Sequence, residues 1–219
     1  MTETKESNTI VTRWWWIRHA PVPNPEQRCY GQRDMDCDTS HEPSFHALAA
    51  RLPKEAVWIA TTLQRTQLTA AAIHAAAASA DKPQMALERD LMEQHFGQWQ
   101  GLTYAEIGAF GLSSAAMPNH RFWLAPAHEV PPGGESFVDV IARVSAAVTR
   151  LNRMHAGRDI VAVAHGGSIR AALAFALDLN PEAALAFSID PLSLTRVDHV
   201  DGPGAGHGWR IGVVNQPAV

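Results

Sequence analysis

Short runs of consecutive apolar residues alternate along the chain with stretches that have helical periodicity. The runs are too short for helices and lack a polar face, which is typical of buried strands. They predict strands at 14–17, 56–61, 85–89, 159–164, 192–200 and 209–214, the last two as a terminal hairpin. Amphipathic spacing and an alanine-rich segment predict helices over 41–52, 62–80, 103–109, 136–155 and 168–178. Because strands and helices alternate, we predict an α/β fold, a three-layer sandwich with a mainly parallel central sheet flanked by helices.

One segment interrupts this alternation. Residues 94–135 are rich in Gly, Pro and scattered aromatic side chains, with a single short predicted helix near 103–109. A stretch this long with so little regular structure is usually functional. We therefore predict a single domain over 11–219 with a lid insertion at about 94–135, preceded by a disordered tail over 1–10.

The composition fits one globular domain and argues against several classes of protein. The chain has 219 residues, 46% of them hydrophobic, and 18 basic against 22 acidic side chains give a net charge of -4. This balance argues against a nucleic-acid partner held by bulk electrostatics. No apolar run approaches the roughly 20 residues that cross a bilayer, and the polar start does not resemble a signal peptide. We expect a cytoplasmic protein with neither a nucleic-acid nor a membrane partner.

Polar residues with no role in a core follow three of the first four predicted strands. Arg18 and His19 follow the first strand, Thr61 and then Arg65 follow the second, and His165 follows the fourth. In an open α/β sheet, ligands bind at the carboxyl ends of the strands, and helix N-termini there add positive dipole ends. Two histidines and two arginines converging on one edge therefore predict a phosphate site.

Five short segments, spanning about residues 13–175, carry a further pattern. They are R-H-A at 18–20, T-T-L-Q-R-T-Q-L-T-A at 61–70, L-M-E-Q-H-F-G-Q-W-Q-G at 91–101, P-G-G-E-S at 132–136 and V-A-H-G-G at 163–167. In this order they resemble the motifs of the histidine phosphatase superfamily, in its phosphoglycerate-mutase-like branch. The chain departs from that pattern at Ala20, where the family has glycine, and at Pro25, which stands with Asn24 beside it where asparagine is expected.

Phosphoryl-transfer chemistry and the resemblance together assign roles to the edge residues. A neutral ring nitrogen of His19 can attack phosphorus and hold a phosphohistidine. Arg18 and Arg65 offer forked donors to the phosphoryl oxygens, a geometry that lysine cannot copy. The resemblance implies that His165 is a second cation that stabilises the transition state, assisted by the backbone amide of Gly166.

The leaving group also needs a proton donor. The resemblance implies that Glu93 is the general acid and then the general base for the attacking water, with Glu88, Asp90 and Glu135 as rivals. We expect neither a metal nor a cofactor, because the histidines lie on separate segments without H-x-H or H-E-x-x-H spacing.

Four residues are predicted to contact the organic part of the substrate. They are Asn24, Glu135, Ser136 and Trp123. Ser136 equally suits the N-cap of the following helix, and Trp123 equally suits core packing, so both alternatives stay open.

The leading functional hypothesis is a phosphatase for a small phosphomonoester, with α-ribazole phosphate as one candidate substrate by resemblance. Within the same fold the alternative is a phosphoglycerate mutase, which must protect its phosphohistidine from water. A different class is a protein-acting module, either a protein phosphohistidine phosphatase or a non-catalytic phosphate binder. The predicted lid favours a small enclosed substrate, and the oligomeric state is left open, with a homodimer as one option.

Overall fold

The structure is a computed structural model that describes residues 9–77, 84–110 and 123–219. These residues form one six-stranded sheet, in the order β3-β2-β4-β1-β5-β6. The strands are β1 Ile10–Arg18, β2 Val57–Ala60, β3 Met85–Leu87, β4 Asp159–Ala164, β5 Leu194–Asp201 and β6 Trp209–Gln216. The helices are α1 Glu42–Arg51, α2 Gln64–Ala76, α3 Tyr104–Phe110, α4 Phe137–Met154, α5 Gly166–Leu177 and α6 Pro181–Ala184, with short 3-10 helices η1 Arg89–Leu91 and η2 Gly97–Trp99.

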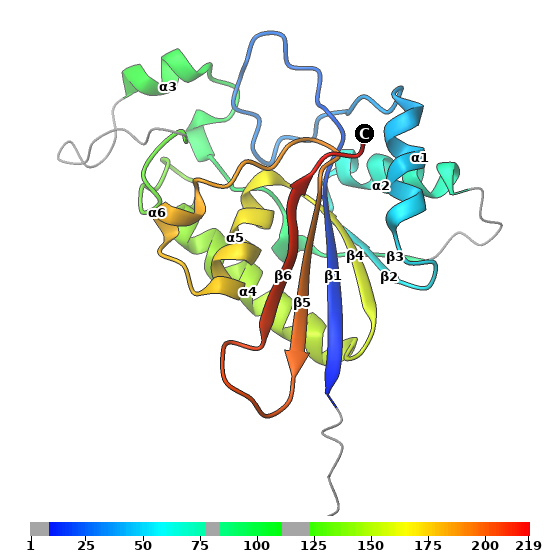
Figure 1. Cartoon of the computed structure of the whole chain (residues 1–219). Helices are drawn as coiled ribbons and strands as arrows, with labels where there is room; N and C mark the ends of the chain where they lie inside the picture. Colours follow the sequence, from blue (N-terminus) through cyan, green and yellow to red (C-terminus); the bar gives the residue numbers. More distant parts are fainter. Residues whose placement is uncertain (1–8, 78–83, 111–122) are drawn as a thin grey trace, which may run out of the picture.

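The sheet is mostly parallel, as predicted. Strands β3, β2, β4 and β1 run parallel to one another, and β5 and β6 continue the sheet antiparallel to β1 as the expected hairpin. Arg18 of β1 pairs with Ala164 of β4, and Ala60 of β2 pairs with Val163, so these three strands end at the same level. The segments that follow them leave the sheet at one edge, the upper edge in Figure 1.

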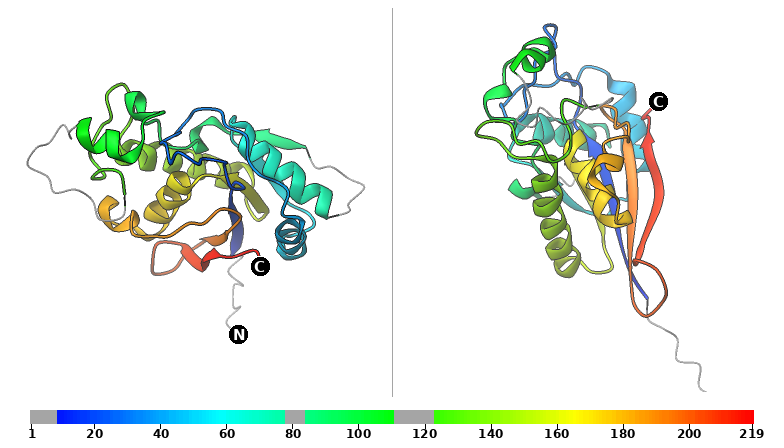
Figure 2. Two further views of the ribbon diagram at one scale, coloured as in Figure 1. Left: turned by 90° about the horizontal axis from the view of Figure 1, so that it is seen from above. Right: turned by 90° about the vertical axis from the view of Figure 1, so that its left-hand side faces the viewer.

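Helices cover both faces of the sheet, which confirms the three-layer arrangement. Helices α4 and α5 lie on one face, and α1 and α2 lie on the other (Figures 1 and 2). Trp14 and Trp16 of β1 stack with ring centroids 4.8 Å apart in the core under α4 and α5, whereas Ile17 belongs to the core under α1 and α2. Because successive strand side chains point to opposite faces, one apolar run supplies both cores.

Two ends differ from the predictions at the limits of the described residues. The tail predicted over 1–10 is too long, because Ile10 already pairs with Asp201 of β5 as the first residue of β1. Residues 1–8 of that tail lie outside the described residues. Helix α2 ends at Ala76 with Ala77 as its C-cap, so the predicted end near residue 80 is too late.

Other bounds shift by a few residues for local reasons. Strand β3 ends at Leu87 because the next residue, Glu88, leaves the strand to become the N-cap of η1. Leu192 was predicted to begin the hairpin, but its φ of 59° is left-handed, and β5 begins only at Leu194. Helix α5 begins at Gly166, inside the predicted turn, which places the first backbone N–H groups of the helix at the strand ends.

The predicted lid segment contains more structure than its composition suggested. The expected short helix is present as α3, and Thr103 forms an isolated bridge with Arg28 in the loop after β1. A small separate core joins the two segments and contains Cys29, Phe96, Trp99, Ile107 and Ala125. Residues 111–122 of the segment lie outside the described residues, and its action as a lid stays a prediction. Among the described helices, none has the length and apolar character needed to cross a membrane.

Candidate active site

Two histidines meet at the upper edge of the sheet. His19 follows β1, and its backbone N–H donates to the carbonyl of Ala164, the last residue of β4, at 3.0 Å. His165 is the next residue along, and the ring centroids of the two histidines lie 5.2 Å apart. His19 is 1% exposed and His165 is fully buried. Parallel pairing of β1 with β4 thus joins two side chains that are far apart in the sequence.

The hydrogen bonding of His19 leaves one ring nitrogen available for reaction. Its Nδ1 lies 2.7 Å from the carbonyl oxygen of Ala20, which can only accept, so Nδ1 carries the proton and Nε2 keeps its lone pair. Burial first, and then the charges of Arg65 and Arg18, lower the pKa of His19 to about 3. A neutral ring with a free lone pair is the form of histidine that can attack phosphorus.

Ala20, the departure from the R-H-G signature, is accommodated without backbone strain. Positive φ values among the described non-glycine residues occur elsewhere, so the loop does not require a glycine here. The backbone N–H of Ala20 donates to Thr69 Oγ1 at 2.8 Å, and its methyl group belongs to the core under α1 and α2.

Two arginines are held beside the histidines by backbone carbonyls. Arg65 of α2 is fully buried and donates from Nη1 to the carbonyl of Arg33 at 2.9 Å and from Nη2 to that of Gly31 at 2.7 Å. Arg18 donates from Nη1 to the carbonyl of Ile189 at 2.6 Å. These bonds orient each guanidinium and leave its Nε free, and both Nε atoms are buried without a hydrogen-bond partner among the described residues.

His165 contributes a third free nitrogen. Its Nε2 lies 2.9 Å from Thr61 Oγ1, and its Nδ1 is buried and unpartnered within the described part of the chain. Burial, then the charges of Arg65, His19 and Arg18, lowers the pKa of His165 well below its usual value. Unpaired buried nitrogens are costly in a folded protein. An oxyanion at this point would accept from both arginine Nε–H groups, and from His165 Nδ1 in the tautomer in which Nε2 accepts from the Thr61 hydroxyl.

Glu93 reaches the same place from the loop after η1. Its carboxylate accepts a hydrogen bond from the backbone N–H of Gly167 at 3.1 Å, in the first turn of α5, and another from Gln94 N–H at 2.9 Å. The approach to α5 is so close that a Cβ on Gly167 would lie 2.2 Å from Glu93 Oε1. The predicted acid is therefore adjacent to the segment that carries His165.

The three rival acids instead pair with arginines of α4. Glu88 lies 2.6 Å and Asp90 4.0 Å from Arg150 Nη2, and Glu135 lies 2.8 Å from Arg143 Nη2. The carboxylates of Glu88 and Glu135 are engaged in these pairs, and the Asp90 side chain is half exposed, so the geometry favours Glu93 over them as the proton donor.

This constellation matches a known family. The family model for the histidine phosphatase superfamily (branch 1) matches residues 14–212. The chain belongs to this superfamily. A glucosyl-3-phosphoglycerate phosphatase from Mycolicibacterium vanbaalenii is 32% identical over 228 residues, which covers 95% of this chain and 96% of that protein.

Solved structures of the superfamily show the same architecture. The native structure of a mycobacterial glucosyl-3-phosphoglycerate phosphatase has a TM-score of 0.75 at 27% identity and covers 94% of this chain and 99% of that one. The α-ribazole phosphatase from Shigella flexneri has a TM-score of 0.70 at 20% identity, with 93% and 96% covered, and shares the fold. The chain also spans about half (51%) of the length of a bifunctional protein from Mycobacterium tuberculosis, to which it is 31% identical over 87% of its own residues.

Three of the predicted substrate contacts in this member of the histidine phosphatase superfamily are engaged by the protein itself. Asn24 exchanges two hydrogen bonds with the backbone of Arg28, at 2.8 and 3.0 Å, and so shapes the loop after β1. Ser136 is the N-cap of α4, in a capping box with Asp139, which was the alternative for this residue. Glu135 is bound to an arginine of α4, as described above. Direct contact between any of the three and a substrate stays a prediction.

Arg170 is a site residue that the sequence reasoning missed. It lies one helical turn after Gly166 on α5, and its Nη1 is 3.0 Å from the point that a Cβ on Gly166 would occupy, with Arg18 Nε 3.8 Å from the same point. Its Nε donates to the carbonyl of Phe187 at 2.7 Å, and its guanidinium lies 4.6 Å above the ring centre of Trp123. Trp123 also packs against two of the hydrophobic cores, which confirms the core-packing alternative for this residue, while its contact with a substrate stays a prediction.

Burial is the largest influence on Arg170 and lowers its pKa to about 10, against an opposing effect of the charge on Glu93. The signal in the sequence was the spacing, because residues four apart share one face of a helix and Gly166 begins this helix. Among the described residues, the candidate site included, no group of three or more His, Cys, Asp or Glu side chains could hold a metal ion.

Proposed function

We propose that this member of the histidine phosphatase superfamily hydrolyses a small phosphomonoester through a phosphohistidine on His19. The observation that carries the proposal is the neutral His19 ring, with Nε2 free, beside three buried nitrogens of Arg18, Arg65 and His165 that have no partner among the described residues. A nucleophile surrounded by unpaired donors is the arrangement that phosphoryl transfer requires.

The reaction has two steps. In the first, Nε2 of His19 forms a bond to phosphorus, the phosphorus–oxygen ester bond breaks, and protonated Glu93 gives its proton to the leaving oxygen. In the second, water attacks the phosphohistidine, Glu93 takes the proton of the water, and the phosphorus–nitrogen bond breaks to release inorganic phosphate. Arg18, Arg65 and His165 donate to the phosphoryl oxygens throughout and stabilise their charge in the transition state.

The leaving group is proposed to be a polar alcohol that carries its own negative charge. Arg170 supports this, because it adds a cation beside Arg18, beyond the two arginines proposed for the phosphoryl group. The similarity to phosphatases named for glucosyl-3-phosphoglycerate supports the same class. An α-ribazole phosphate is less favoured, since the structure of that name is 20% identical and argues for the fold alone.

A phosphatase assay with four separate substrates tests the proposal and its alternatives. The purified protein is incubated with 3-phosphoglycerate, glycerol 3-phosphate, α-ribazole phosphate or a protein that carries phosphohistidine, and both inorganic phosphate and 2-phosphoglycerate are measured. We expect one phosphate released for each substrate consumed. Isomerisation of 3-phosphoglycerate with little phosphate release would indicate the mutase, and turnover of a phosphohistidine protein alone would indicate the protein phosphatase.

The nucleophile is tested separately by trapping acid-labile phosphate on the enzyme. His19→Ala should abolish turnover and yield no phosphoenzyme, while His207→Ala, which removes an exposed histidine in the β5–β6 loop, serves as the control. Acid-labile phosphate on the His19→Ala protein would place the nucleophile elsewhere, with His165 the first suspect.

A further inference from the structure

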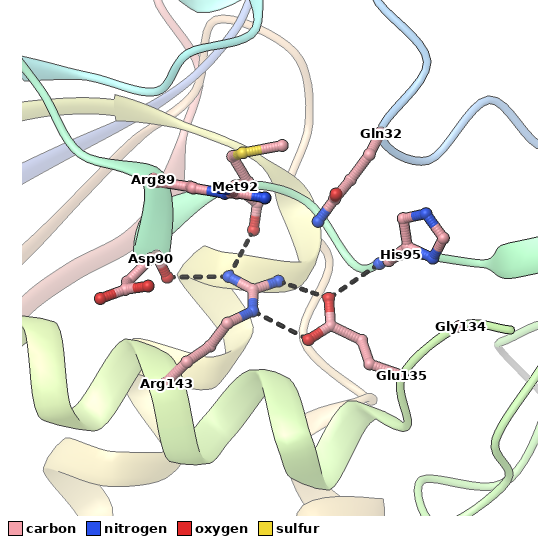
Figure 3. A pocket seen from close by; sticks show the side chains of 8 residues that line it. All are labelled: Gln32, Arg89, Asp90, Met92, His95, Gly134, Glu135 and Arg143. Atoms are coloured by element: carbon pink, nitrogen blue, oxygen red, sulfur yellow. Dashed lines mark hydrogen bonds and ion pairs between the residues drawn. The ribbon is translucent and has the colours of Figure 1, made fainter.

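A pocket of ≈ 310 Å³ lies beside the segment that carries Glu93, and Figure 3 shows the residues that line it. It is lined by Gln32, Arg89, Asp90, Met92, His95, Gly134, Glu135 and Arg143. The side chains of Arg143 and Glu135 point toward one another across it, from α4 and from the turn before that helix. The polar atoms of Arg143 and Glu135 already bind protein groups and are not free to bind a ligand. The contacts that this pair makes with the neighbouring backbone therefore indicate its role.

Arg143 uses every N–H of its guanidinium on this pocket. Nη1 donates to the carbonyls of Asp90 and Met92 at 2.8 and 2.9 Å, and Nη2 donates to the carbonyl of Glu93 at 3.0 Å. Nε and Nη2 also bind the two carboxylate oxygens of Glu135 at 2.9 and 2.8 Å. These contacts account for the five donors that an arginine possesses, in the forked geometry that suits a carboxylate.

The three carbonyls belong to the four residues that end at Glu93. Glu135 extends the same attachment, because Oε1 accepts the backbone N–H of His95 at 2.8 Å. Its backbone carbonyl also accepts from the side chain of Gln94 at 2.8 Å. The backbone is thus bound on both sides of Glu93, while the Glu93 carboxylate itself is held by backbone N–H groups of Gly167 and Gln94.

We infer that Arg143 and Glu135 form a clamp that positions the proton donor Glu93 against α5. This inference rests on the proposed role of Glu93 as general acid, and it makes Arg143 a positioning residue that acts through the backbone. The Glu135 carboxylate balances the Arg143 charge, so the clamp holds Glu93 without adding net positive charge behind it. Lysine cannot replace Arg143, because its single ammonium has only three donors and no fork to span carbonyls and carboxylate together.

The inference predicts a defect that depends on the leaving group. Proton donation matters greatly for an alkyl phosphate and little for p-nitrophenyl phosphate, whose alcohol leaves readily. A displacement near 1 Å can cost about 100-fold in rate. We therefore expect Arg143→Lys to slow phosphorylation of the enzyme by an alkyl phosphate roughly 10- to 100-fold, and by p-nitrophenyl phosphate less than about 3-fold.

The test measures single-turnover phosphorylation with both substrates. Arg150→Lys is the matched control, since Arg150 lies on the same helix, is 48% exposed at its side chain and pairs with Glu88 instead. Glu93→Gln gives the reference pattern, and in its background Arg143→Lys should add little further loss on the alkyl phosphate. If Arg143→Lys does not fold, Glu135→Gln tests the same clamp and should show a smaller loss in the same direction.

The outcomes distinguish a failure of the clamp from a failure of the proposed function of Glu93. Equal losses on both substrates for Arg143→Lys, with Glu93→Gln selective, would overturn the clamp and leave the function standing. The same holds if Arg143→Lys and Glu135→Gln both fold and match the wild type. If Glu93→Gln itself shows no dependence on the leaving group, the proposed general acid is wrong and the clamp inference fails with it.

Discussion

Keeping His19 neutral in the fold should make the protein sensitive to acid. In the folded protein, burial and the charges of Arg65 and Arg18 lower the pKa of His19 from 6.5 to about 3. Between these two values the unfolded chain binds a proton that the folded chain does not, so stability falls as the pH falls from 6.5 toward 3. A His19→Gln substitution removes this pH dependence, because glutamine does not titrate.

The size of the effect follows from the two pKa values. Proton linkage gives a loss of about 2 kcal/mol from His19 between pH 7 and pH 5. The result depends mainly on the unfolded pKa, because any folded value well below 5 leaves the ring neutral at pH 5. Solvent screens the ring little, since the His19 side chain lies in the interior with 1% exposure.

The assay is urea unfolding at pH 7 and at pH 5, followed by tryptophan fluorescence, for which buried Trp14, Trp16 and Trp99 are suitable reporters. The wild type should lose about 2 kcal/mol more than His19→Gln on going from pH 7 to pH 5. His207→Gln, at the exposed loop between β5 and β6, should keep the wild-type loss. An equal loss in the wild type and in His19→Gln would refute the reasoning, because it would mean that His19 takes up its proton in the folded state.

Three further predictions concern the reaction. Activity should survive EDTA, because Arg18 and Arg65 supply positive charge and His165 a further buried nitrogen beside it; loss on chelation that a divalent ion restores would contradict this. Gly167→Ala should cut the rate on an alkyl phosphate about 100-fold, because the added Cβ would lie 2.2 Å from the Glu93 carboxylate. The control Gly204→Ala should leave kcat unchanged, because a Cβ there meets nothing within 4 Å. Arg170→Gln should lower kcat/KM for 3-phosphoglycerate about 10- to 100-fold more than for glycerol 3-phosphate; equal losses would mean that Arg170 reads no second charge.

Much of the fold followed from local pattern alone. Short apolar runs are stable only when both faces of the strand are buried. Their alternation with helical segments leaves few arrangements besides a parallel sheet with helices packed on both faces. The common edge of Arg18, His19 and His165 followed as well, because parallel strands in register end together. Element bounds were less predictable, since pairing of Ile10 and the left-handed φ of Leu192 depend on what each residue meets in space.

The sequence by itself determined which residues are the candidates for the chemistry, because reactive side chains stand directly after strands and in a recognisable order. Only the tertiary structure decided how they are tuned. The tautomer of His19 depends on the carbonyl of Ala20, and its low pKa depends on burial and on Arg65. Along the chain, Arg143 and Arg170 look like ordinary cations of a helix surface. Packing of α4 against a loop remote in sequence places Arg143 against the backbone of the Glu93 segment. Arg170 of α5 lies beside Arg18 at the candidate phosphate site, and no local sequence pattern predicts either contact.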